Sequence, residues 1–121
     1  MTAATRDPHD LLPLTATMFH VLVALADDDR HGYAVIKDVS MRSGGRVEIG
    51  TGTLYGIIKR LLAEGLILES KRRPPAADDD DRRRYYRITP FGKQVVMAET
   101  ARLEAMVDAA RGTQMLRREK A

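Results

Sequence analysis

The fold of this chain is decided by one stretch: Thr51-Gly-Thr-Leu-Tyr-Gly-Ile-Ile-Lys-Arg-Leu-Leu-Ala-Glu-Gly65-Leu-Ile-Leu-Glu-Ser-Lys71. Its first part places Leu54, Ile58 and Leu61 at helical spacing, which predicts an amphipathic helix over residues 51–64. Gly65 is expected to end this helix, because glycine readily adopts the left-handed conformation that closes helices. The opposite helix face is small and polar, so it can approach another surface without steric hindrance.

A β-hairpin with a long tip is expected directly after this helix. Residues 66–73 and 82–89 have the composition of two strands. Pro74 and Pro75 end the first strand, because proline cannot donate a hydrogen bond to a ladder.

Three further helices are expected on either side of this unit. Residues 14–26 and 33–42 have apolar residues at helical spacing and are separated by a polar break. After the hairpin, Thr89 is a capping residue and Pro90 suits the first helical position. The last helix is expected to run from Pro90 to at least Ala110.

The order helix, helix, short link, helix, hairpin, helix predicts a mainly α domain with a small β-hairpin (α+β), of winged helix-turn-helix type. We expect a flexible N-terminal arm over residues 1–10 and the winged helix-turn-helix domain over residues 11–89. Residues 90–121 are expected to form a C-terminal dimerisation helix and a tail.

Two helices have more apolar surface than one small domain can cover, which predicts a homodimer. The helix over residues 14–26 is apolar on two faces, and the last helix repeats Val96, Leu103 and Ala110 every seven residues. The expected interface residues are Met18, Phe19, Leu22, Val96, Leu103, Met106, Val107 and Ala110.

Positive charge is concentrated in the hairpin rather than spread along the chain. The net charge is only +3. The basic side chains of the hairpin region are Lys71, Arg72, Arg73, Arg82, Arg83, Arg84 and Arg87. A cluster of this density is typical of proteins that bind a polyanion.

A winged helix with a basic hairpin is expected to hold double-stranded DNA in two ways. The third helix enters the major groove, where base edges can be distinguished, and the wing neutralises backbone phosphates. The expected DNA contacts are Thr51, Thr53, Tyr55 and Lys59 in the groove, Tyr33 and Arg60 on phosphates, and Lys71, Arg72, Arg73, Arg82, Arg83 and Arg84 in the wing. A winged helix that contacts only proteins is the competing hypothesis.

Several function classes lack the residues that they need. The chain contains no cysteine, which excludes disulfides and thiolate zinc sites. His9, His20 and His31 lack metal-ligand spacing, and no nucleophile–base pair or nucleotide-binding glycine loop is evident. The acidic run Asp78–Asp81 is most simply a solvated loop; pairing with the wing arginines and binding of a hard cation are the alternatives. We therefore expect no enzyme activity, no cofactor and no metal.

The sequence also suggests a cytoplasmic protein without a membrane partner. No apolar run approaches the roughly 20 residues that a membrane span needs. The N-terminal residues lack the apolar centre of a signal peptide.

Several short motifs together resemble those of the PadR family of transcriptional regulators. They are Gly52-Thr-Leu-Tyr55 with Arg60-Leu61 and Glu64-Gly-Leu-Ile67, Arg84-Tyr-Tyr-Arg-Ile-Thr89 with Gly92, and His31-Gly-Tyr33. The resemblance spans about residues 12–110 and is to the short subfamily with a single C-terminal helix. It implies a DNA-binding repressor that is dimeric through its first and last helices and acts on palindromic promoter sites.

The resemblance further implies a possible small-molecule effector, because members often sense phenolic or planar cationic compounds near the dimer interface. The tryptophan that some members use there is absent from this chain. Gly56 stands where a proline is frequent, and Leu62 stands where an acid is frequent. A regulator of MarR or ArsR type is the nearest alternative, although its longer termini or metal ligands are not evident.

Overall fold

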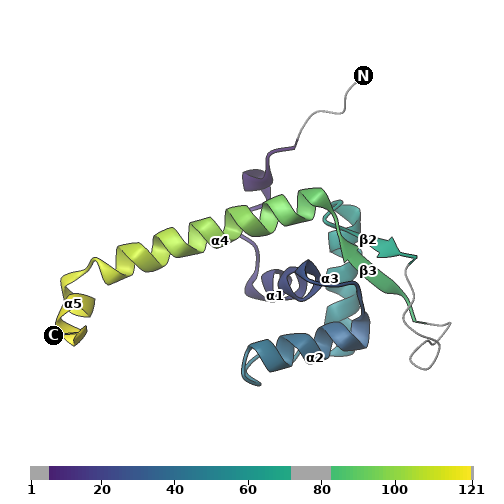
Figure 1. The fold of residues 1–121 in the computed structure, drawn as a ribbon, viewed down its shortest axis with the longest axis horizontal. Helices are drawn as coiled ribbons and strands as arrows, with labels where there is room; N and C mark the ends of the chain where they lie inside the picture. Colours follow the sequence, from purple (N-terminus) through teal and green to yellow (C-terminus); the bar gives the residue numbers. More distant parts are fainter. Residues whose placement is uncertain (1–5, 72–82, 121) are drawn as a thin grey trace.

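The computed structural model describes residues 6–71 and 83–120. In chain order the elements are η1 (Pro8–Leu11), α1 (Ala16–Ala26), β1 (Arg30–His31), α2 (Gly32–Arg42), α3 (Thr51–Ala63), β2 (Ile67–Ser70), β3 (Tyr85–Ile88), α4 (Pro90–Arg111) and α5 (Gln114–Lys120). In Figure 1, α1, α2 and α3 gather on one side of α4, and the far half of α4 extends away from this body. Three helices followed by a hairpin form the expected winged helix-turn-helix.

Two helices begin at threonine residues whose side chains cap them, and the sequence identifies the second of these. Thr15 caps α1 by accepting a hydrogen bond of 3.1 Å from the Met18 amide. Thr89 caps α4 by accepting one of 2.9 Å from the Gly92 amide, and Pro90 occupies the first turn. The Thr89 amide also donates a hydrogen bond of 3.0 Å to the Leu66 carbonyl, which fixes the start of α4 relative to the base of the hairpin.

The sheet contains a third strand that the sequence pattern did not predict. The strand order is β1-β3-β2, and both pairings are antiparallel. Ile67 lies opposite Ile88 between β2 and β3, and Arg30 lies opposite Tyr86 between β1 and β3. β1 has only two residues, too few for alternation to identify it.

The hairpin is present, but its strands are shorter than the expected ranges. β2 and β3 each contain four residues. The connection between them lies mostly outside the described residues, and so do the predictions for Arg72, Arg73, Arg82 and Asp78–Asp81.

The hydrophobic core lies between α1, α2, α3, the sheet and the start of α4, and it includes two of the expected interface residues, Met18 and Leu22. Within the single protomer Leu22 is 0% exposed and Met18 is 8% exposed. Both side chains belong to the core cluster, so little of their surface is left for a second subunit. Helical periodicity finds two apolar faces on α1, but it does not say which face the rest of the same chain covers.

The N-terminal segment is attached to α3 and α4 in the part of the expected arm that the structure describes. η1 packs against α4. Arg6 forms a salt bridge of 2.9 Å with Glu64, and its guanidinium lies 4.7 Å from the centre of the Phe91 ring. These contacts join distant parts of the chain, so local sequence gives no sign of them.

Glu99 connects α4 to the residues that precede α1. Its side chain is almost completely buried and accepts hydrogen bonds from the Leu14 amide at 2.9 Å and from Arg102 Nε at 2.5 Å. The hydrogen bond from Arg102 lowers the pKa of Glu99, although burial opposes this shift. The ionised carboxylate therefore holds α4 against the N-terminal segment.

Candidate nucleic-acid interface

α3 separates a buried apolar face from an exposed polar face, as the sequence predicts. Leu54, Ile58 and Leu61 are buried. The expected DNA contacts of this helix are all exposed: Thr51, Thr53, Tyr55, Lys59 and Arg60. Gly65 ends the helix region with a φ of +75°, the left-handed conformation that glycine favours.

The first turn of α3 is sterically open. Gly50 caps the helix without a side-chain hydrogen bond. A Cβ added at Gly50 or Gly52 would meet no atom within 4 Å. The amides of a helix start attract anions, so the backbone here can approach a phosphate closely.

The wing arginines that the structure describes contact neighbouring side chains. Arg84 forms a salt bridge of 3.1 Å with Glu69 across the hairpin, and Arg83 Nη1 lies 3.1 Å from His31 Nε2. Lys71 is exposed just after β2. An exposed ion pair contributes about 1 kcal/mol or less, so Arg84 can exchange Glu69 for a phosphate at little cost.

Arg87 belongs to the same basic run but has a different environment. Its Nη2 lies 3.0 Å from Asp29 Oδ2, and the same carboxylate accepts a hydrogen bond of 2.6 Å from Ser70. The hydrogen bond with Asp29 raises the pKa of Arg87. The salt bridge with Asp29 therefore neutralises the charge of Arg87, one of the basic residues of the hairpin region.

The start of α2 adds aromatic groups to this region. The Tyr33 ring is exposed and stacks on His31, with ring centres 6.5 Å apart and an interplanar angle of 6°. Lys37 Nζ lies 5.3 Å from the centre of the Tyr33 ring. Tyr33 was expected to contact phosphate, and this lysine places a cation beside it.

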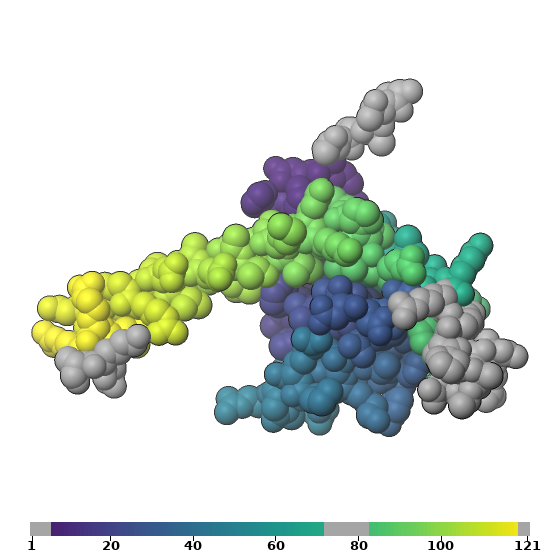
Figure 2. Space-filling model, viewed as in Figure 1, coloured from purple at the N-terminus to yellow at the C-terminus, as the bar shows by residue number. Residues whose placement is uncertain are grey.

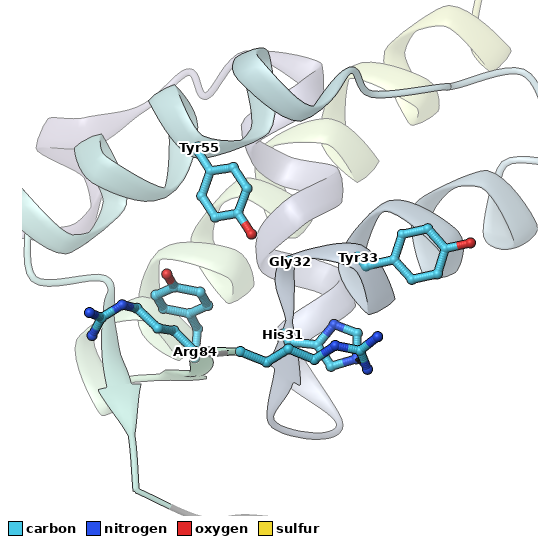
Figure 3. Close-up of a pocket in the computed structure, with 7 residues that line it drawn as sticks. His31, Gly32, Tyr33, Tyr55 and Arg84 are labelled. Atoms are coloured by element: carbon cyan, nitrogen blue, oxygen red, sulfur yellow. Dashed lines mark hydrogen bonds between the residues drawn. The ribbon is translucent and has the colours of Figure 1, made fainter. Parts of the chain in front are cut away.

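A cleft of about 340 Å³ joins the start of α2, α3 and the wing. Its lining residues are His31, Gly32, Tyr33, Tyr55, Arg83, Arg84 and Tyr86. Figure 3 shows Tyr55 reaching from α3 toward Gly32. A Cβ on Gly32 would lie 2.5 Å from the Tyr55 hydroxyl, so only glycine allows this approach. Four of these residues are among the expected DNA contacts, whereas His31, Gly32 and Tyr86 are not. The proximity of His31 and Tyr86 depends on β1 pairing with β3.

His31 has two competing contacts in this cleft. Its Nδ1 lies 3.1 Å from the Ala34 amide, as a cap of α2, while its Nε2 faces Arg83. A neutral imidazole has one acceptor nitrogen, so only one of the two contacts can be a hydrogen bond at a time. Burial, and then the nearby charge of Arg83, lower the pKa of His31.

We expect His31 to make folding stability depend on pH. Because its pKa is lower in the folded chain, the unfolded chain takes up the proton first. The stability present above the ordinary histidine pKa of about 6.5 is therefore lost as the pH falls through that value. Urea unfolding at several pH values should show a smaller loss for His31→Asn, since asparagine caps helices without titrating. Equal losses in both proteins would contradict this assignment.

A second concave surface lies between α1 and the outer part of α4. This groove, of about 500 Å³, is lined by Phe19, Thr100, Leu103, Glu104, Val107 and Asp108. Next to it on α4, Met106 is 56% exposed, and Val107 in the groove itself is 48% exposed. Figure 2 shows this part of α4 standing clear of the body. Three expected interface residues thus line one groove.

Other site types find no support in the part of the chain that the structure describes. Among residues 6–71 and 83–120, no three His, Cys, Asp or Glu side chains are grouped closely enough to hold a metal ion. No helix in those ranges combines the length and apolar character needed to cross a membrane.

A winged helix-turn-helix with an exposed polar helix and a basic wing is the architecture of a transcriptional regulator. Residues 21–98 match the transcriptional regulator PadR-like family. The transcriptional regulator Rv3488 of Mycobacterium tuberculosis is 34% identical over 99 residues, which are 82% of this chain and 86% of that protein. The chain therefore belongs to the PadR-like family of transcriptional regulators, as its motifs predicted.

Solved structures of other regulators have a similar fold. A transcriptional regulator from Clostridium thermocellum has a TM-score of 0.66 at 25% identity, over 80% of this chain and 88% of that one. BpsR of Bordetella bronchiseptica has a TM-score of 0.59 at 29% identity, over 86% of this chain and 71% of that one. The family and these relatives are regulators rather than enzymes, which agrees with the expectation from the sequence.

Proposed function

We propose that this PadR-like regulator binds double-stranded DNA as a homodimer and represses transcription from a palindromic site. The observation that carries the proposal is the gathering of α3, the start of α2 and the wing around one exposed, cation-bearing surface. α3 presents its polar face to the major groove, and the wing places cations beside the backbone.

The homodimer is supported by the groove between α1 and α4. Phe19, Leu103 and Val107 form an apolar strip there, in which Val107 is 48% exposed and the other two side chains are half-buried in the described part of the protomer. A second copy of the chain supplies the same strip in the opposite direction, as two-fold symmetry requires. Two α3 helices then contact half-sites about one helical turn apart, roughly 34 Å.

Regulation by a small molecule forms the last part of this proposal. DNA binding by BpsR is regulated by 6-hydroxynicotinic acid. In the present chain, a ligand at the subunit interface acts by favouring one orientation of the two protomers over another. A change in orientation alters the spacing of the two α3 helices and so the affinity for the site.

Replacing Lys59 with alanine should weaken binding to the specific site about tenfold, because a side chain that hydrogen-bonds a base edge contributes roughly 1–3 kcal/mol of discrimination. Affinity for unrelated duplex DNA should change much less. Gel shift or fluorescence anisotropy with the DNA upstream of the regulator's own gene measures both. Lys93→Ala is the matched control, since Lys93 is exposed at the start of α4 and does not line the cleft.

The control and the variant separate the possible outcomes. Equal specific affinity for Lys59→Ala and the wild type would reject Lys59 as a base-contacting residue. A wild-type protein that shifts no duplex even at low salt would reject DNA binding and favour the hypothesis of a winged helix that contacts proteins.

A further inference from the structure

Tyr86 is a buried polar residue whose hydroxyl has no protein partner in the described part of the chain. The residue lies in β3, is 5% exposed, and lines the cleft between α3 and the wing. No hydrogen bond joins its hydroxyl to any described residue. Buried hydroxyl groups almost always have a partner, and leaving one without costs about 1–3 kcal/mol. At the wall of a cleft, such a hydroxyl is available to hydrogen-bond an atom of a bound ligand in place of water.

The surroundings of Tyr86 specify what kind of ligand this is. Arg83 and Arg84 line the same cleft with two guanidinium groups, against the single carboxylate of Glu69 that pairs with Arg84. The Tyr55 hydroxyl approaches from α3. Burial raises the pKa of Tyr86, so its hydroxyl keeps its proton and can donate it in a hydrogen bond. A net positive cleft with hydroxyl donors is complementary to a tetrahedral oxyanion such as a phosphate group.

We propose that this cleft holds one phosphate of the DNA backbone, with the Tyr86 hydroxyl donating at its wall and Arg83 and Arg84 at its rim. The inference rests on the proposed function, because it takes DNA as the source of the phosphate. The cleft lies between the helix that enters the major groove and the wing that follows the backbone, where a phosphate must pass. Arg84 exchanges Glu69 for the phosphate when DNA arrives.

Tyr86→Phe tests the proposal, because it removes only the hydroxyl and keeps the packed ring. We expect affinity for duplex DNA to fall about tenfold, by a similar factor for every sequence, since a backbone contact does not distinguish bases. Thermal stability should be unchanged or higher, because the variant no longer buries an unpaired hydroxyl. Tyr85→Phe is the matched control: this neighbour in β3 is also buried but does not line the cleft, so its duplex affinity should equal that of the wild type.

A second measurement identifies the source of the phosphate. Duplex binding by the wild type and by Tyr86→Phe is compared with and without inorganic phosphate, with chloride at matched ionic strength as the reference. The proposal expects phosphate to compete with duplex more strongly in the wild type than in the variant.

Each other outcome overturns a different statement. If the wild type binds no duplex, the proposed function fails whatever the cleft does. If the wild type and Tyr86→Phe bind duplex equally, and phosphate acts on both alike, the cleft is not a phosphate site. If phosphate competes with duplex only in the wild type, while duplex affinity without phosphate is the same in both proteins, the cleft binds free phosphate and the assignment to DNA is wrong.

Discussion

Gly92→Ala is expected to lower the free energy of unfolding by about 3 kcal/mol or more, an unusually large effect for one added methyl group. An added Cβ would lie 2.1 Å from the carbonyl oxygen of Leu66 and 2.8 Å from a side-chain carbon of Ile88. The first of these is a backbone atom, so no rotamer change can relieve the clash.

The surrounding hydrogen bonds prevent the backbone from moving aside. The Leu66 carbonyl accepts from the Thr89 amide at 3.0 Å, and the Thr89 hydroxyl donates to the Gly65 carbonyl at 2.7 Å, with the Leu66 carbonyl oxygen 3.1 Å away. The same hydroxyl accepts from the Gly92 amide. Shifting α4 to admit the methyl group would break this set of bonds, which joins the end of α3, the base of the wing and the start of α4.

Gly56→Ala is the matched control for this experiment. A Cβ at Gly56 meets nothing within 4 Å, and the residue lies inside α3. Alanine is favoured over glycine in a helix by up to about 1 kcal/mol, so this variant should be slightly more stable than the wild type. Urea unfolding at a fixed protein concentration compares the three proteins. Loss of stability in Gly56→Ala equal to that in Gly92→Ala would show that the close contact with Leu66 is not the cause.

Local sequence signals account for most of the helices and for the hairpin. Thr89 and Pro90 act within one helical turn of their own positions, so they can be recognised without knowing the fold. The buried face of α3 is similarly local, because three apolar residues at helical spacing define it. These local signals do not determine which part of the chain packs against the apolar face of each helix.

The remaining features depend on contacts between distant segments. β1 exists because Arg30 and His31 pair with β3, more than fifty residues later. The cleft at Tyr86 requires the same pairing, and the attachment of η1 to α4 requires Arg6 to reach Glu64. A single sequence contains the residues for these contacts but no periodicity that connects them, so the cleft between α2, α3 and the wing could not be predicted.

For the expected dimer too, the sequence alone does not show which of the two apolar faces of α1 the protomer itself covers. Met18 and Leu22 have the hydrophobic character of an interface, but the rest of the protomer covers them. Phe19 lies on the other side and lines the groove with α4. Burial in the protomer therefore narrows the expected interface to the residues that remain accessible along this groove and on outer α4.

If the chain forms the proposed homodimer, Val107→Glu is expected to convert it into monomers and to reduce affinity for the proposed palindromic site by about 10²–10⁴-fold. Val107 is half exposed in the protomer, so glutamate should leave the protomer folded, but two-fold symmetry would place two new carboxylates in one apolar interface. The loss of affinity follows because a monomer holds one half-site without the high effective concentration that the second subunit supplies.

Ala109→Glu gives the matched control, because two residues along a helix correspond to a rotation of about 200°, which puts Ala109 on the face of α4 opposite the groove. Size-exclusion chromatography with light scattering measures the mass, and anisotropy with one-half-site and two-half-site duplexes measures binding. The control should remain dimeric and prefer the longer duplex, whereas Val107→Glu should bind both duplexes alike. A dimeric Val107→Glu protein would place the interface elsewhere, and a monomeric one that kept full affinity would show that DNA binding needs only one subunit.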